Sequence, residues 1–414
     1  MNDLTSRMST LTPEQRRLLE KRIKGRELEP VVHSKRATEI IKGKQEGART
    51  DGDRAFLTEQ EAALRPMEFS IFFFADDASS DANNRYHLLM ECAKYADTQG
   101  FTAVWTPERH FHAFGGLYPN PAVLGAALSM ATKNLEIRAG SVVLPLHNPI
   151  RVVEDWSVVD NLSNGRVGIA LASGWHPDDF ALIPENYPDR KKVMYRHLET
   201  IKKLWAGESL NIQGGGGNEI SIKTFPRPVR KELPIWLSSS GNIETFIKAG
   251  ENGLNILTSL INQTPEELGD KIRVYRKTLE ENGFDPDSRK VSLMIHTFIG
   301  TDFEFVNQKV KQPIFNYLRT NLDLHVSMAR GRSIQIDVDR FTRQDEDSIL
   351  SFAFERYINH SSLLGTLEAC EKMVTRLKCI GINECACLLD FGLDVDSVLK
   401  SLELVSELRR ICNR

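Results

Sequence analysis

The chain has 414 residues and a formal net charge of −3, with 41% hydrophobic and 26% charged residues. This balance is typical of a soluble globular protein with one large domain or two ordinary ones, and it gives no electrostatic case for binding nucleic acid or an anionic membrane surface. No apolar run approaches the roughly 20 residues that cross a bilayer, and the N-terminus lacks the apolar centre of a secretory signal. The six cysteines are spread without metal-ligand pairs. We therefore expect free thiols in a reducing cytoplasm.

Residues 1–66 differ from the rest of the chain in their pattern of charged, apolar and aromatic residues. Thr12 as N-cap and Pro13 in the first turn predict a short amphipathic helix, and the glycine-rich, charged stretch 42–53 reads as a flexible linker. The only aromatic side chain in this part is Phe56. We therefore expect an N-terminal appendage at 1–66 that has no core of its own, followed by one large domain at 67–414.

From Met67 onward, apolar strand patterns alternate with helical patterns. Strands are expected at 69–74, 102–105, 135–144, 166–172, 234–237, 254–257, 291–300 and 383–390. Helices are expected at 83–100, 120–132, 149–162, 189–205, 242–250, 265–282, 366–377 and 395–412. A small hairpin at 210–222 and an irregular, mostly helical insertion at about 302–362 interrupt this order. Eight strand–helix units predict an α/β fold, a (β/α)8 TIM barrel with insertions, rather than a doubly wound sheet.

Ionisable side chains gather just after the second expected strand, in the order Glu108, Arg109, His110. In such barrels the C-terminal ends of the strands carry the chemistry, although a charged loop with one stacked histidine has the same pattern. Three further histidines near expected strand ends can equally be structural or line a pocket: His112, His147 and His176. Asp160 is expected at a helix surface or cap. No histidine or acid spacing predicts a metal site.

Clusters of small and polar residues follow three other strands. They are Ala139, Gly140 and Ser141 after the third strand; Ser173 and Gly174 after the fourth; and Ser239, Ser240, Gly241 and Asn242 after the fifth, with Thr245 in the next helical turn. Small residues let a flat ring lie against the backbone. The last cluster offers N–H groups, hydroxyls and the positive end of a helix dipole, which suits a phosphate group. Simple N-capping of the helix explains that cluster equally well. No Gly-x-Gly-x-x-Gly follows a strand, which argues against a dinucleotide-binding domain.

Taken together, several stretches resemble the bacterial luciferase-like monooxygenases, which use reduced flavin mononucleotide (FMN). The resemblance covers about residues 67–410 and rests on 105–111, 139–145, 147–151, 159–166 and 173–176. The branch that it resembles most is the one found in polyketide and nonribosomal-peptide biosynthesis. The short segment 11–22 also resembles the helix that links modules in such assembly lines.

This resemblance implies a barrel that binds reduced FMN (FMNH2) and O2. It implies oxidation through a flavin C4a-peroxide of a biosynthetic intermediate tethered to a carrier protein, by hydroxylation, N-oxidation or Baeyer–Villiger-type insertion. The implied partners are a separate flavin reductase, an acyl or peptidyl carrier protein or synthase module docking through 1–66, and a second copy in a homodimer. Two alternatives stay open: a hydride-transfer oxidoreductase that uses the deazaflavin F420, and a carrier-docking scaffold without catalysis.

The resemblance also assigns roles by position. Ala139 and Gly140 fall where the family often has a strained peptide under the flavin ring, and Ser240, Gly241, Asn242 and Thr245 fall on the phosphate site. Ser173 stands where luciferases have a phosphate-binding arginine. Arg109 stands where luciferases have their catalytic histidine, so the catalytic role is open between Arg109 and its neighbours His110 and Glu108.

Overall fold

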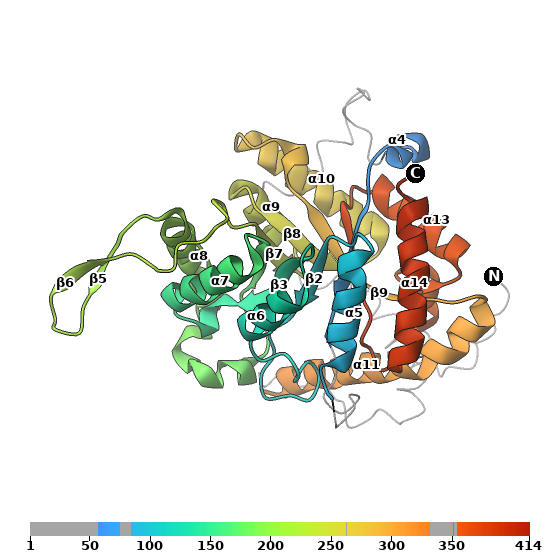
Figure 1. Ribbon diagram of the computed structural model, residues 1–414, viewed down its shortest axis with the longest axis horizontal. Coiled ribbons are helices and arrows are strands. Elements are labelled where there is room, and N and C mark those ends of the chain that lie inside the picture. The colour runs from blue at the N-terminus through green and yellow to red at the C-terminus, as the bar shows by residue number, and fades with distance from the viewer. Residues whose placement is uncertain (1–56, 75–83, 262, 332–350, 352–353) are drawn as a thin grey trace, which may run out of the picture. The chain divides into compact units, whose positions relative to one another are not determined.

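Eight parallel strands close into a ring at the centre of the molecule (Figure 1). The computed structural model describes residues 57–74, 84–261, 263–331, 351 and 354–414, of which 320–331 are described by their backbone alone. Around the ring the strands are β1 (Glu68–Phe72), β2 (Ala103–Thr106), β3 (Glu136–Val143), β4 (Val167–Ala172), β7 (Ile235–Ser239), β8 (Asn255–Ser259), β9 (Val291–Ile299) and β11 (Glu384–Leu388). Because β11 pairs with β1 in parallel, the ring is closed. The (β/α)8 barrel predicted from the sequence is confirmed.

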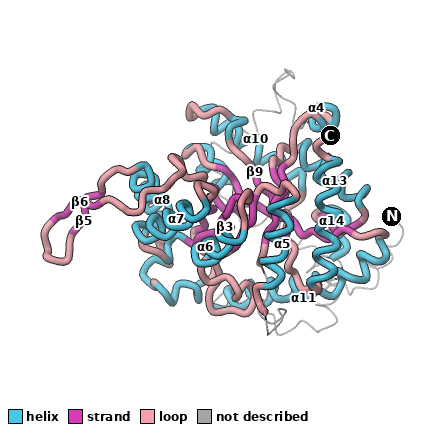
Figure 2. Tube along the Cα trace, in the orientation of Figure 1, coloured by secondary structure: helices cyan, strands magenta, loops and turns pink. Residues whose placement is uncertain are grey.

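Helices surround this ring of strands, as Figure 2 shows. They are α5 (His87–Thr98), α6 (Pro121–Ala131), α7 (Pro149–Ser163), α8 (Arg190–Ala206), α9 (Ile243–Glu251), α10 (Pro265–Glu281), α13 (Leu367–Cys379) and α14 (Val395–Ile411). Their starts follow capping chemistry: Asn120 and Asn148 each accept a backbone N–H of the first turn and precede a proline. Within the described residues, no helix is both long and apolar enough to cross a bilayer.

Two insertions interrupt the strand–helix alternation. The antiparallel hairpin of β5 (Leu210–Gln213) and β6 (Glu219–Ile222) projects from the barrel (Figure 1). The chain then returns along α7, where the Arg230 N–H donates to Asp160 Oδ2 at 2.8 Å. Asp160 is therefore buried, and the prediction of a surface or capping position was wrong. After β9 come the long helix α11 (Phe303–Gly331), a helical stretch at 354–360 and the short strand β10 (Leu363–Gly365), which pairs with the end of β9.

The last part of the predicted appendage lies on the barrel. Helix α4 (Glu59–Ala63) is capped by Thr58 and Glu61, and it contacts α13. The Leu57 N–H donates to the Cys379 carbonyl at 2.9 Å. The predicted amphipathic helix and linker fall within residues 1–56, outside the described residues.

A buried ion pair crosses the interior of the barrel near the start of the strands. Arg138 of β3 donates to Glu384 of β11 from Nη1, at 3.0 Å to Oε1 and 2.9 Å to Oε2. The guanidinium lies between two indole rings, with 4.9 Å to the centroid of Trp105 and 4.6 Å to that of Trp236. Serines of β1 and β9 and the Trp105 indole donate to the same carboxylate: Ser70, Ser292 and Trp105. The ion pair and its donors therefore connect five of the eight strands.

Burial alone would neutralise both partners of this pair, but each stabilises the charge of the other. Burial opposes ionisation of Glu384, yet the Arg138 charge and the hydroxyl donors lower the pKa of its carboxyl group. Likewise the two nearby carboxylates, Glu384 and Glu136, raise the pKa of Arg138 against its burial. The pair thus stays ionised near the N-terminal ends of the strands, whereas the chemistry of such barrels occurs at the C-terminal ends.

Removing one charge from this pair should cost much more stability than removing a surface charge. Glu384→Gln keeps the side-chain shape but leaves Arg138 with reduced compensation, and we expect it to lower the free energy of unfolding by about 3–5 kcal/mol. The matched control is Glu368→Gln, whose exposed carboxylate pairs with Lys372 at 2.6 Å within α13. We expect this control to change stability by less than about 0.5 kcal/mol. Urea unfolding of both variants measures the difference, and similar losses would contradict a special role for the buried pair.

Candidate active site

Glu108 is the centre of the polar side chains that follow β2. Its carboxylate is fully buried and accepts from two imidazoles through Oε1, at 2.9 Å from His110 Nε2 and 2.6 Å from His147 Nε2. Its Oε2 accepts the backbone N–H of Val143, at the end of β3, at 2.7 Å. The loop after β2 and the loop after β3 are therefore joined by one carboxylate that orients two histidines.

The charges in this cluster support one another. Burial raises the pKa of Glu108, but the hydrogen bonds from His110 and His147 outweigh that effect, and the net pKa is lowered. Burial disfavours the imidazolium of His147, but the hydrogen bond to Glu108 and its charge raise the pKa of His147 above its ordinary value. The cluster can therefore hold a proton on His147 beside an ionised Glu108.

Arg109 points the other way, towards the loop after β4. Its Nη1 donates to Asp179 Oδ2 at 2.7 Å, and both side chains are buried. The guanidinium lies 5.0 Å from the ring centroid of Trp175. Burial lowers the pKa of Arg109, and the charge of Asp179 opposes this. Nε and Nη2 of Arg109 are buried without a hydrogen-bond partner among the described residues. Arg109 thus joins the loops after β2 and β4, and its Nε and Nη2 nitrogens stay available to a ligand.

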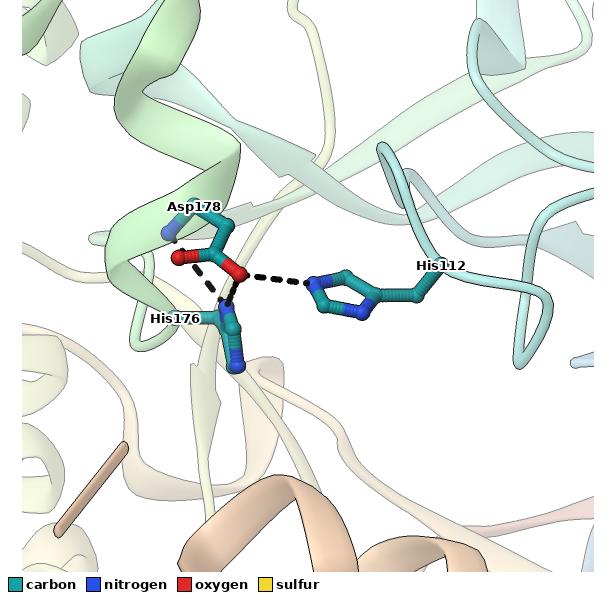
Figure 3. Close-up of side chains that lie close together, drawn as sticks. All are labelled: His112, His176 and Asp178. Atoms are coloured by element: carbon teal, nitrogen blue, oxygen red, sulfur yellow. Dashed lines mark hydrogen bonds and ion pairs between the residues drawn. The ribbon is translucent and has the colours of Figure 1, made fainter. Parts of the chain in front are cut away.

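A second contact between polar side chains joins the same two loops. His112 Nε2 lies 3.6 Å from Asp178 Oδ2, and His176 Nδ1 lies 3.8 Å from the same oxygen (Figure 3). One ligand-type atom from each residue lies within 4.8 Å of the others, a spacing that could hold a metal ion. Burial and the charge of Arg109 both lower the pKa of His112. Because this buried cation would also repel a divalent metal, we interpret the cluster as a link between loops.

The small residues Ala139, Gly140 and Ser141 lie within β3. Ala139 and Gly140 are buried within β3, and the peptide between Gly140 and Ser141 is cis. The resemblance placed the unusual peptide one residue earlier, between Ala139 and Gly140, and that position was wrong. A Cβ atom at Gly140 would lie 2.7 Å from the Phe72 ring of β1, so only glycine leaves room for that ring beside β3.

The loop after β4 begins with Ser173 and Gly174. Gly174 has a φ of +76°, and a Cβ there would lie 2.6 Å from the Phe180 ring. Arg190 at the start of α8 donates from Nε to the Gly174 carbonyl at 3.1 Å. Ser173 stands where luciferases have a phosphate-binding arginine, and Arg190 places a guanidinium beside the same loop. The sequence did not predict this role of Arg190.

The polar cluster after β7 forms the start of α9. The Asn242 side chain caps the helix by accepting the Glu244 N–H at 2.9 Å, and the Gly241 N–H donates to Ser239 Oγ at 3.2 Å. Ser240 is exposed, and Thr245 lies in the first helical turn. A Cβ at Gly241, whose φ is +111°, would lie 3.3 Å from Lys271 Nζ. The predicted cluster thus has a cation from α10 next to it.

The structure separates the predicted residues around the barrel. Glu108 and His110 share a hydrogen bond, and Arg109 turns away to Asp179. Residues 139–141 lie within β3, 173–174 follow β4, and the 239–245 cluster begins at the last residue of β7. Three further residues lie beside these groups and were not predicted from the sequence: Asp179, Arg190 and Lys271. No local signal marks them, since each acquires its role from a contact with a segment distant in the sequence.

A search of protein families adds independent evidence. The family described as luciferase-like monooxygenase matches residues 67–384, which is most of the chain. The chain belongs to this family. It is therefore an enzyme, as the sequence predicted, and a monooxygenase of the luciferase-like type. The predicted link to the polyketide and peptide branch stays a prediction.

Two curated relatives of this luciferase-like chain have named activities. The oxygenase component of flavin-dependent trigonelline monooxygenase from Acinetobacter baylyi is 27% identical over 58% of this chain and 66% of its own length. The alkanal monooxygenase α chain of Photorhabdus luminescens is 24% identical over 76% of this chain and 88% of its own length. Both are monooxygenases by name.

Solved structures share the fold at lower identity. The oxygenating constituent of 3,6-diketocamphane monooxygenase from Pseudomonas putida, in complex with FMN, has a TM-score of 0.67 and 17% identity, covering 84% of this chain and 98% of that one. An F420-dependent secondary alcohol dehydrogenase has a TM-score of 0.61 and 19% identity, covering 84% and 99%. At these identities the likeness concerns the fold alone.

The Glu108 cluster predicts an altered titration of His147. Glu108→Gln removes the charge that raises the pKa of His147 and leaves burial to lower it, so the pKa should fall to or below the ordinary value of about 6.5. In the native chain, the raised pKa contributes stability that is fully present below about pH 6.5 and is lost as pH rises through the folded-state value. NMR titration of the histidine ring carbons, with His147→Gln to assign the signal, measures this. An unchanged His147 pKa in Glu108→Gln would show that Glu108 does not control it.

Proposed function

We propose that this luciferase-like monooxygenase uses reduced FMN and O2, and that FMN lies across the C-terminal ends of the strands. The observation that carries the proposal is the group of phosphate-binding elements beside α9. The Ser239 hydroxyl and the Lys271 side chain, which donates to Gln263 Oε1 at 2.7 Å, both lie beside Gly241 at the N-terminus of that helix. Such N–H groups and a nearby cation suit a phosphate monoester. Ser239, Ser240, Gly241, Asn242 and Thr245 would hold the phosphate.

The elements expected to flank the flavin ring also fit. Ala139, Gly140 and Ser141 present backbone with little side-chain bulk at the end of β3, and Ser173 and Gly174 do so after β4. Ser238 Oγ, on β7 between Trp236 and the phosphate cluster, is a buried atom without a partner among the described residues. A flavin has both an apolar ring face and polar edges, so it could cover the first group and satisfy the second.

When bound, reduced FMN supplies the electrons that activate O2. The residues of this chain would then control protons and water. Glu108 accepts hydrogen bonds from His110 and His147, and its charge lets the half-buried His147 keep a proton. His110 is the imidazole placed by that carboxylate to exchange a proton with the reacting atoms. Arg109, balanced by Asp179, positions the loops and can donate its remaining N–H groups to an anionic or carbonyl group of the ligand.

A charge placed beside the proposed phosphate site tests the cofactor. Asn242→Asp keeps a good helix cap but adds a negative charge at the N-terminus of α9, and we expect it to weaken FMN binding about fivefold or more. Riboflavin, which lacks the phosphate, should lose much less affinity. The matched control is Asn252→Asp at the other end of the same helix, which should leave FMN affinity near the wild-type value. Fluorescence titrations measure all three proteins. Equal losses for FMN and riboflavin would mean that the cluster only caps the helix.

F420-dependent hydride transfer is the second candidate, because an F420-dependent dehydrogenase shares the fold. The two candidates differ in their need for oxygen: a monooxygenase consumes O2 with reduced FMN, whereas a hydride-transfer enzyme reduces its substrate anaerobically. The monooxygenase names of the relatives support the first candidate. No nicotinamide-binding motif is visible in the sequence, so we also propose that a separate reductase supplies the reduced flavin. The trigonelline relative is likewise named as an oxygenase component.

For the substrate we propose a polyketide or peptide intermediate presented on a carrier protein, with residues 1–56 as the docking segment. The support is the sequence pattern of a capped amphipathic helix followed by a glycine-rich linker. An amphipathic helix can bind in a groove of a partner protein, and a flexible tether lets it do so at a distance.

Deletion of residues 1–56 tests this docking role and keeps α4 on the barrel. We expect the truncated chain to bind FMN and to consume O2 with reduced flavin as the full chain does. Oxidation of an acyl group on a carrier protein should slow, because the tethered docking contact is lost. Oxidation of the same acyl group on a small thioester should be unchanged and serves as the control. Equal rates for both chains on the carrier-bound substrate would rule out docking through this segment.

A further inference from the structure

The interior of the barrel mouth contains a buried histidine that the proposed chemistry does not use. His296 of β9 is 1% exposed, and its Nδ1 lies 2.6 Å from the Tyr357 hydroxyl. Its Nε2 is buried and has no hydrogen-bond partner among the described residues. Buried polar atoms are nearly always hydrogen-bonded, and leaving one without a partner costs stability. Such an exception calls for a ligand that completes it.

The strand register places His296 at the level of the proposed flavin site. His296 pairs with Leu388 of β11, and Leu388 pairs with Phe72 of β1. Side chains alternate between the two faces of a strand. Ser292 of β9 and Glu384 of β11 share a hydrogen bond inside the barrel, so residues an even number of positions away from them on the same strand also face the interior. His296 therefore faces the interior, in the same layer as Phe72. The Phe72 ring is also the group that Gly140 approaches from β3.

The surroundings of His296 are aromatic. Its ring centroid lies 4.4 Å from that of Tyr317, 5.3 Å from Tyr357 and 5.2 Å from Phe391. Phe114, from the loop after β2, continues the wall at 5.1 Å from Tyr317. The two tyrosines come from the insertion after β9, in α11 and in the helical stretch 354–360. The insertion thus builds one wall of the barrel mouth from rings that suit a planar ligand.

The protonation state of His296 follows from these contacts. Burial lowers the pKa of His296 to about 3, so the imidazole is neutral at physiological pH. Burial also raises the pKa of Tyr357, which therefore keeps its proton. An imidazole nitrogen is a better acceptor than a phenol oxygen, so the Tyr357 hydroxyl donates to Nδ1. The single N–H proton of the neutral imidazole must then reside on Nε2, which makes Nε2 a donor.

We propose that His296 Nε2 donates a hydrogen bond to a carbonyl oxygen of the substrate, and that the substrate is an aromatic or conjugated carbonyl compound. Its planar part lies against the rings of Tyr317, Tyr357 and Phe391. His296 is a specificity residue, and Tyr357 is a positioning residue that fixes its tautomer. This inference rests on the proposed function, because it places the substrate beside the flavin site, but its test does not require turnover.

The test compares two isosteric probes, acetophenone and α-methylstyrene, by equilibrium dialysis against the full chain without flavin. The first has a carbonyl oxygen where the second has a methylene carbon. We expect the wild-type chain to bind acetophenone about fivefold more tightly, as one hydrogen bond to a buried donor allows. His296→Phe should abolish this preference. His296→Gln, whose amide N–H can replace Nε2, should restore part of it. The matched control His87→Gln, at the exposed start of α5, should retain all of it.

A double variant separates binding from folding. His296→Phe with Tyr357→Phe removes both hydrogen-bonding partners and keeps aromatic volume, so its melting temperature should equal or exceed that of the wild type. It should also lack the preference for acetophenone. Three results would overturn the proposal. The double variant could keep the preference for acetophenone, or the wild-type chain could bind both probes equally or bind neither. The variants could also lose FMN affinity in place of the probe preference. Failure of the wild type to bind FMN would instead contradict the proposed function, and the dialysis result would still stand.

Discussion

The buried Arg138–Glu384 pair is the interaction on which the barrel depends. Its charges compensate each other only if β3 and β11 hold their present register, because a shift by one residue would turn either side chain out of the barrel. Trp105 and Trp236 enclose the guanidinium from β2 and β7, and Ser292 adds β9 to the same network. A polar network of this kind specifies one arrangement of strands more sharply than apolar packing does, since every alternative leaves a buried charge without its partner.

The ion pair lies near the N-terminal ends of the strands, opposite the end at which the chemistry of such barrels occurs. Above the ion pair the interior is lined by Phe72, Gly140, Leu388 and His296, which the register brings to the barrel mouth. The loops beyond the strand ends then supply the charged groups. Their geometry depends on contacts between loops, such as the one between Arg109 and Asp179, more than on the conformation of any single loop.

The sequence predicted the parts of this structure that depend on short-range patterns. Strand–helix alternation predicted the barrel, and the capping pattern at Asn242 predicted the start of α9. The sequence could not show which distant side chains would meet. His147 lies 39 residues from Glu108, Asp179 lies 70 residues from Arg109, and Tyr357 lies 61 residues from His296. Each of these partners acquires its role only when the strands are arranged in the ring, and the same holds for the burial of Asp160.

Two histidines at the barrel mouth show how the fold divides the site into unlike environments. His147 lies beside β3, and its pKa is raised because Glu108 compensates its charge. His296 lies on β9 across the ring, and its pKa is lowered to about 3 because it is buried among aromatic rings. No carboxylate contacts His296 among the described residues. One wall therefore stabilises charge and can store a proton, and the opposite wall excludes charge and favours a neutral planar ligand. A flavin bound between them would have its substrate on the apolar side and its proton donors on the ionic side. The apolar wall would keep the oxidised group dry, and the ionic wall would supply protons at its edge.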